Sequence, residues 1–154
     1  MWSAPTLIGT SEDMRYGYCI FCDDVRTEIG EKLSFIGVYS GVLTLPEFPF
    51  SLPKFCVHVN LITSSTEPYR SIVLRCAAPG DRQPILEERL DPAQLDEQKD
   101  LSSGVEVNDT PLNVVIGASL IFSPLRLRQP GLLTVSAIID DKPAEIASLR
   151  VAQR

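Results

Sequence analysis

The stretch KFCVHVNLIT, residues 54–63, decides the fold class. Apolar side chains occupy every second position, at Phe55, Val57, Val59 and Leu61. The positions between them hold Cys56, His58 and Asn60. Side chains alternate between the two faces of an extended chain, so this period of two is typical of a β-strand. The pattern predicts one buried face and one semi-exposed polar face.

Most of the remaining chain also has strand character. The stretches rich in alternating, β-branched or aromatic residues are 17–22, 33–40, 70–77, 132–140 and 145–151, with a weaker one at 84–90. In the segment 145–151, Ala147, Leu149 and Val151 are expected to point inward. The segment NVVIGASLIF, 113–122, is apolar on both faces and is therefore predicted to lie centrally in a sheet. The residues DDKP at 140–143 favour a tight turn, which predicts a C-terminal hairpin.

These segments predict an all-β protein, an antiparallel, immunoglobulin-like β-sandwich of seven or eight strands. A barrel is the alternative. One short helix is expected within 91–100, with Asp91 as N-cap and Gln94 as its capping-box partner. The length of 154 residues suits a single domain, placed at 16–154 after a flexible segment, 1–15.

Composition narrows the function. The net charge of −6 argues against a nucleic-acid-binding surface. No apolar run reaches the length of about 18 residues that a membrane span needs. The start of the chain does not resemble a secretion signal, and the four cysteines then suggest reduced thiols in the cytoplasm. The chain has no P-loop, GxGxxG, GxSxG or HExxH motif, so the sequence favours a non-enzymatic protein without a cofactor.

A CxxC spacing stands out in YGYCIFCDDVRTE, residues 16–28. A redox pair needs a lowered thiol pKa, whereas the acidic residues that follow Cys22 would raise it. In a strand, Cys19 and Cys22 would also face opposite sides of the sheet. The structural interpretation is therefore that both cysteines serve only the packing of a strand. The alternative hypothesis is a metal-binding or small-ligand site formed by Cys19, Cys22, Cys56 and His58.

The charged residues directly after this pair are Asp23, Asp24 and Arg26. We expect them to fix a structural turn through ion pairs and capping. The segment 28–32 then joins two strands, with Gly30 able to adopt a positive φ. A third hypothesis, a hydrolytic enzyme, would need Asp23, Asp24 and His58 to converge in one pocket.

The segment LPEFPFSLP, residues 45–53, places Phe48, Pro49 and Phe50 in a proline-stiffened loop. One interpretation is a loop that plugs the end of the sandwich core. The functional interpretation is a rigid apolar surface for an unknown protein partner. The leading hypothesis is therefore a module that acts through protein–protein contacts, with homodimerisation through an exposed edge strand also open.

Residues 21–41, FCDDVRTEIGEKLSFIGVYSG, resemble the signature of an uncharacterised family of small bacterial proteins. The resemblance rests on FCDDVR at 21–26, KLS at 32–34 and IGVYSG at 36–41. FPFSLPKFCVHVNL and the closing segment PGLLTVSAIIDDKPAEIASLRV are similar to later parts of that family, so the similarity spans nearly the whole chain after about residue 15. It implies a bacterial or phage source and no particular activity.

Overall fold

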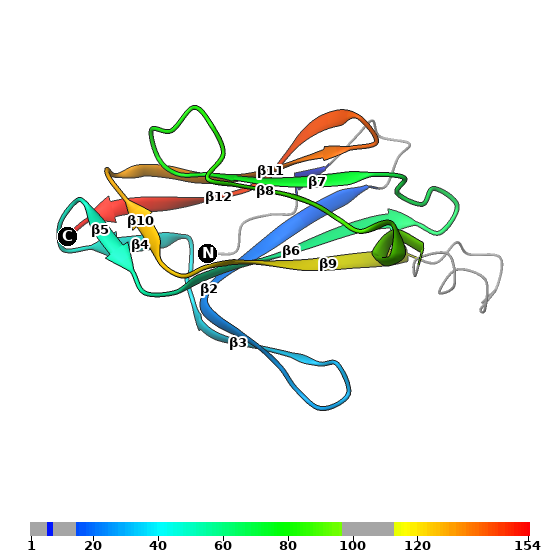
Figure 1. The fold of residues 1–154 in the computed structure, drawn as a ribbon, viewed down its shortest axis with the longest axis horizontal. Helices are drawn as coiled ribbons and strands as arrows, with labels where there is room; N and C mark the ends of the chain where they lie inside the picture. Colours follow the sequence, from blue (N-terminus) through cyan, green and yellow to red (C-terminus); the bar gives the residue numbers. More distant parts are fainter. Residues whose placement is uncertain (1–5, 8–14, 97–112) are drawn as a thin grey trace.

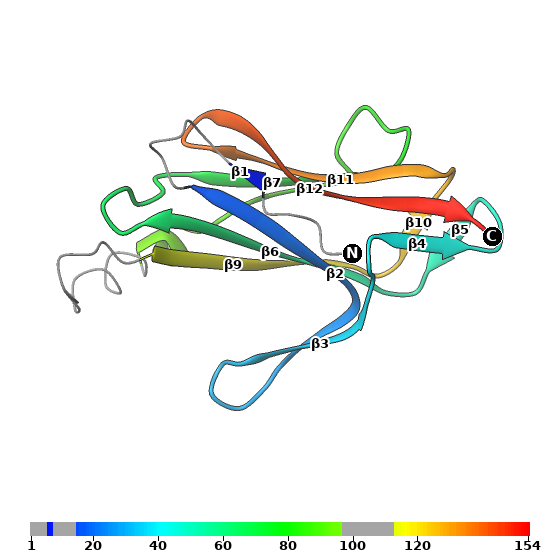
Figure 2. The same ribbon diagram turned by 180° about the vertical axis from the view of Figure 1, so that it is seen from behind.

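Two five-stranded sheets face each other and enclose the core (Figure 1). This computed structural model describes residues 6–7, 15–96 and 113–154. The first sheet has the order β1 (Thr6–Leu7), β2 (Tyr16–Thr27), β6 (Phe55–Ser64) and β9 (Asn113–Phe122), with β3 (Leu33–Val38) paired to β2. The second has the order β4 (Val42–Leu45), β12 (Lys142–Gln153), β11 (Gly131–Ile139), β7 (Ile72–Ala77) and β8 (Leu86–Arg89). A ribbon of β5 (Phe50–Leu52) and β10 (Leu125–Leu127) lies near one end of the sandwich (Figure 2).

The predicted all-β sandwich is confirmed, with more strands than expected. The described residues form twelve strands, and the additional ones are mostly short, such as β1, β5 and β10. Two or three residues are too few to show an alternating pattern, which is why the sequence did not predict them.

The pairing order is that of an immunoglobulin-like domain. The neighbours β2, β6 and β9 form one layer, and β12, β11, β7 and β8 form the other, as in strands A-B-E and G-F-C-C′. One pair departs from the expected antiparallel arrangement, since β4 runs parallel to β12. The last two strands form the predicted hairpin, joined by Asp140 and Asp141 at φ 49° and 66°.

The core fills the space between the sheets. Its largest fully buried side chains include Phe55, Leu61, Ile72, Leu74, Leu120, Leu133 and Leu149. Each such side chain contributes about 1.5–3 kcal/mol of hydrophobic stabilisation when it leaves water. The inner face of β11 consists of Leu133, Val135, Ala137 and Ile139, which are all buried.

The inner face of β12 differs from prediction at one position. A bulge shifts the register between β11 and β12, so that Val135 pairs with Ala147 and Ser136 pairs with Glu145. The extra residue, Ile146, is 2% exposed and belongs to the core, whereas Ala147 is only partly buried. A bulge reverses the alternation locally, which sequence periodicity does not reveal.

β6 and β9 both differ from prediction in the exposure of their outer faces. β6 is the central strand, and both of its faces are buried, including Cys56, His58 and Asn60. Its outer face is therefore not semi-exposed as expected. β9, predicted to be central, is the last strand of the first sheet in the described residues. Its outer face leaves Val115 and Ile121 more than half exposed.

The beginning of the domain is anchored earlier than expected. Within the segment predicted to be flexible, 1–15, Thr6 and Leu7 form β1 against β2. Arg15 pairs with Asp140 at 2.9 Å and donates to the carbonyl oxygen of Glu67 at 3.0 Å. The guanidinium also lies over the ring of Tyr69, 4.8 Å from its centroid. These contacts tie the start of β2 to the β11–β12 turn.

The predicted helix starts where expected. Residues 92–96 are helical, and 97–100 lie outside the described residues. The carboxylate of Asp91 accepts from the Ala93 N–H at 2.9 Å, and the Gln94 side chain accepts from the Asp91 N–H at 3.0 Å. This reciprocal pair is the predicted capping box. In the part of the chain that the structure describes, no helix has the length and apolar character required to cross a membrane.

Candidate functional site

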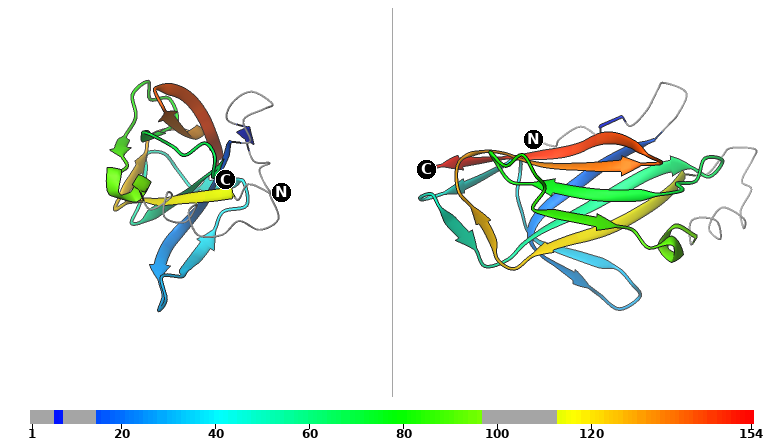
Figure 3. Two further views of the ribbon diagram at one scale, coloured as in Figure 1. Left: turned by 90° about the vertical axis from the view of Figure 1, so that its right-hand side faces the viewer. Right: turned by 45° about the horizontal axis from the view of Figure 1, so that its top comes forward.

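A hairpin, here named the arm (residues 23–38), stands away from the sandwich (Figures 1 and 3). β2 pairs with β6 up to Cys22 and from there pairs only with β3, as far as Thr27. The turn at its tip has Gly30 at φ 81° and is closed by the Glu28 N–H, which donates to the Lys32 carbonyl at 2.7 Å. The arm therefore extends the first sheet beyond the core.

Asp23, Asp24 and Arg26 lie within β2 and do not form the predicted turn. The strand continues because the backbone N–H and C=O groups of these residues find their hydrogen-bond partners in β3. The predicted connecting role belongs instead to the segment 28–32, as the glycine pattern indicated.

Asp23 and Asp24 form side-chain contacts at the root of the arm, where β2 leaves β6 after Cys22. Asp24 accepts from Lys54 at 2.5 Å and from Arg26 at 3.4 Å. The bond from Lys54 is the main reason that the pKa of Asp24 is lowered, and Asp24 in turn raises the pKa of Lys54. The Tyr39 hydroxyl donates to Asp23, and burial together with this carboxylate raises the pKa of Tyr39. These contacts set the direction in which the arm leaves the sheet.

His58 lies on the outer face of the first sheet beside the arm. Its Nδ1 is 2.8 Å from the Ser119 Oγ. The Phe35 ring of the arm packs against the imidazole, with ring centroids 5.2 Å apart. Burial lowers the pKa of His58, and the neighbouring Asn60 only partly opposes this effect, so the ring is neutral at pH 7.

This arrangement serves packing better than catalysis. One of the two nitrogens of the neutral imidazole, Nδ1, is already engaged by Ser119. The ring is 6% exposed and is covered by Phe35. The proposed hydrolytic set does not come together, since Asp23 and Asp24 bind Tyr39, Lys54 and Arg26 while His58 binds other groups. Sequence reasoning missed Ser119, because only the pairing of β6 with β9 places it opposite His58.

The four cysteines are free thiols. Three of them lie on the first sheet and divide between its two faces, whereas Cys76 lies on β7 of the second sheet and belongs to the core. Cys22 and Cys56 are directly paired on the outer face, and their thiols donate to the carbonyl oxygens of Asp24 and Asp23 at 3.4 and 3.8 Å. Cys19 packs against the core, as the prediction of divergence required.

The thiols are poor metal ligands in this state. Burial raises the pKa of Cys22 to about 11, and it raises the pKa of Cys19 and Cys56 as well. A metal ligand must be a thiolate, which a raised pKa disfavours. The predicted set of Cys19, Cys22, Cys56 and His58 is not assembled, and the described residues contain no group of three or more His, Cys, Asp or Glu placed to hold a metal ion.

Phe48, Pro49 and Phe50 plug the end of the core. Both rings are half-buried and pack against the core cluster, beside the ribbon of β5 and β10. Only Pro49, which follows a cis peptide bond, is exposed. The structural interpretation of this loop therefore agrees with the structure, and its use as a protein-binding surface is not favoured.

Exposed apolar surface concentrates on the first sheet. Of ten large apolar side chains that are exposed in the described residues, seven belong to this sheet and its arm: Tyr18, Ile29, Leu33, Ile36, Val38, Val115 and Ile121. Four of the seven are on the arm, where Ile29 at the tip is 96% exposed and Val38 is 54% exposed. Exposed apolar residues that lie close together mark an interaction surface more often than apolar residues that are scattered singly over the surface. The sequence did not reveal them, because the alternation of 33–40 is also that of a core strand.

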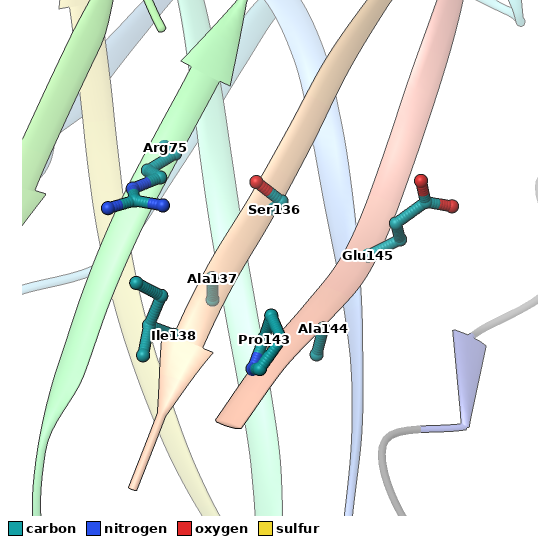
Figure 4. A pocket seen from close by; sticks show the side chains of 7 residues that line it. All are labelled: Arg75, Ser136, Ala137, Ile138, Pro143, Ala144 and Glu145. Carbon is teal, nitrogen blue, oxygen red and sulfur yellow. The ribbon is translucent and has the colours of Figure 1, made fainter. Parts of the chain in front are cut away.

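The second sheet has a shallow hollow on its outer face, over β7, β11 and β12 (Figure 4). Short side chains such as Ser136 and Ala144 line most of it, together with Arg75 and Glu145. The guanidinium of Arg75 already pairs with Glu87 at 2.7 Å. The hollow therefore offers little to recognise a ligand.

Comparison with known proteins identifies the family. A search of curated proteins gave no match, and a search of solved structures gave none either. One family model matches residues 17–152, which is nearly the whole chain, and it confirms the expected membership of a family without an assigned activity. The chain belongs to DUF6941, a family of unknown function.

Proposed function

We propose that this chain is a non-enzymatic module that binds a protein partner through the arm. The observation that carries the proposal is a set of exposed apolar residues on a hairpin that stands outside the core: Ile36 and Val38 on one face of β3, Leu33 on its other face and Ile29 at the tip. A hairpin that only completed the fold would turn these side chains inward. Burial of each of them in an interface would contribute about 1–2 kcal/mol.

The root contacts support this role because they preorganise the arm. Lys54 and Tyr39 hold the two aspartates of β2, and Phe35 packs against His58. A surface that is ordered before binding loses less conformational entropy when a partner docks. The arm is thus suited to present apolar side chains at a fixed angle to the sandwich.

The surroundings in which the module works belong to the same proposal. We place it in the cytoplasm, because the four cysteines are free and burial favours the protonated thiol. We also propose a bacterial source and a protein as the partner. Nucleic-acid binding is not part of the proposal, because the net charge of −6 disfavours contact with phosphates.

Affinity capture from an extract of the source cells tests the proposal. The bait is the full chain, compared with Ile36→Asp on the arm and Leu132→Asp on β11, which is 55% exposed on the other sheet. We expect a protein that is retained by the wild type and by Leu132→Asp but lost with Ile36→Asp. Equal recovery with all three baits, or with none, would contradict binding through the arm. Circular dichroism of each bait confirms that it is folded.

A further inference from the structure

β9 has the composition of a buried strand and the position of an edge strand. Its ten residues, NVVIGASLIF, contain no charged side chain. Within the described residues no strand pairs with its second edge. Val115 and Ile121 are 52% and 54% exposed on its outer face. Soluble proteins usually protect such an edge with charges, proline or short length, since an open edge pairs with other chains.

The edge strands of the second sheet have that protection. β8 has four residues, LEER, of which three are charged. At the other edge, β4 is also only four residues long. Both are consistent with edges that remain in solvent. β9 is neither charged nor short, so we expect its open edge to pair with another strand.

The sequence of β9 is self-complementary about Ala118. In an antiparallel pair of two copies centred on this residue, Gly117 faces Ser119, and the larger residues on either side face one another. The outer-face pair is Val115 with Ile121, which occurs twice across the two-fold axis. The inner-face pairs are Ile116 with Leu120 and Val114 with Phe122. The two large apolar side chains that β9 exposes therefore bury each other, as an isologous interface requires.

The absence of charge on β9 points to the same partner. Two copies that each carry a net charge of −6 repel one another at long range, so they meet best through a neutral surface. Apolar residues toward both ends of β9 supply the cross-strand pairs that stabilise a sheet.

We propose that two copies of this chain pair through β9, antiparallel and with the two-fold axis at Ala118, so that their first sheets join into one continuous sheet. The dimer uses residues separate from the arm and does not rest on the proposed function. It leaves the arm of each copy free, so one dimer presents two arms.

Sedimentation equilibrium of the full chain from 1 to about 100 µM, a range suited to typical interface affinities, tests the dimer. The edge variant is Val115→Lys with Ile121→Lys, and the matched control is Leu132→Lys on the second sheet. We expect the wild type and the control to dimerise, and the edge variant to weaken dimerisation about 100-fold or more. A wild type that is monomeric at the highest concentration, or an edge variant that dimerises as tightly as the control, overturns the proposal. Melting curves show whether each variant is folded, and Ile36→Asp on the arm should dimerise like the wild type.

Disulfide trapping tests the register. Val115→Cys and Ile121→Cys are prepared separately, mixed and oxidised with diamide, after which free thiols are blocked with N-ethylmaleimide. The mixture should give a covalent dimer, because position 115 faces position 121 of the other copy. Val115→Cys alone should not, since its two copies lie six residues apart along the strands, about 20 Å. Efficient trapping of Val115→Cys alone would overturn the two-fold axis at Ala118.

Discussion

Asp140 links three parts of the domain, and its removal should be costly. Its Oδ1 accepts from the backbone N–H groups of Arg70 and Ser71 at 2.7 and 2.9 Å, and its Oδ2 pairs with Arg15 at 2.9 Å. The side chains of Arg15 and Asp140 are 17% and 7% exposed. We predict that Asp140→Ala lowers the free energy of unfolding by about 3–5 kcal/mol, since it removes the only carboxylate paired with a largely buried guanidinium in the described residues and leaves two N–H groups without their acceptor.

Asp140→Asn is the matched variant. Asparagine keeps an acceptor oxygen and tolerates the positive φ of 49° at this position, but it removes the charge. Its cost should therefore be smaller, about 1–3 kcal/mol. Urea denaturation followed by circular dichroism measures both values, with an unchanged m-value as the control for a two-state transition.

The contribution of Asp140 to the free energy of unfolding should also depend on pH, and the direction follows from its pKa. Burial alone would raise the pKa of Asp140, but the N–H groups of Ser71 and Arg70 and the Arg15 guanidinium outweigh it, so the pKa is lowered. A lowered carboxyl pKa contributes stability above the unfolded value, near 4, and this contribution is lost as the pH falls through the folded value. The difference in stability between wild type and Asp140→Asn should therefore shrink below about pH 4. A cost below about 1 kcal/mol for Asp140→Ala, or a difference that is constant from pH 7 to 3, would refute the reasoning.

Three further predictions concern the arm, the thiols and the helix cap. Gly37→Ala should lower stability by about 1–3 kcal/mol, because φ is +68° and the new Cβ would overlap the Asp23 carboxylate; an unchanged thermal melt would contradict this. Cys22 and Cys56 are fully buried, so they should react with a thiol reagent only as fast as the protein opens, and added zinc should not shift the melting temperature; rapid labelling or one bound zinc per chain in native mass spectrometry would restore the metal hypothesis. Asp91→Ala should cost about 1 kcal/mol through loss of the cap, and Asp91→Asn much less, as measured by urea denaturation.

Local patterns predicted the elements well. The capping box of Asp91 and Gln94 and the turn at Asp140 and Asp141 formed as expected, because their signals lie within a few residues of each other.

Sheet positions and cross-strand neighbours were not predictable in this way. β6 has alternating polarity, yet its outer face is buried, because Phe35 of the arm packs against His58. Ser119 meets His58 only through pairing across 61 residues of sequence. The separation of Cys19 from Cys22 was foreseen from the alternation of a strand, whereas the direct pairing of Cys22 with Cys56 depends on register. Such contacts arise from the topology as a whole.

The most direct measurement of the arm's role is photo-crosslinking in living cells. A photoreactive amino acid is placed in turn at Ile36, at Val38 and, as the control, at Leu132 on the second sheet. Binding through the arm predicts that positions 36 and 38 crosslink to the same protein and that position 132 does not. Crosslinking at 36 and 38 that is no stronger than at 132 would contradict it.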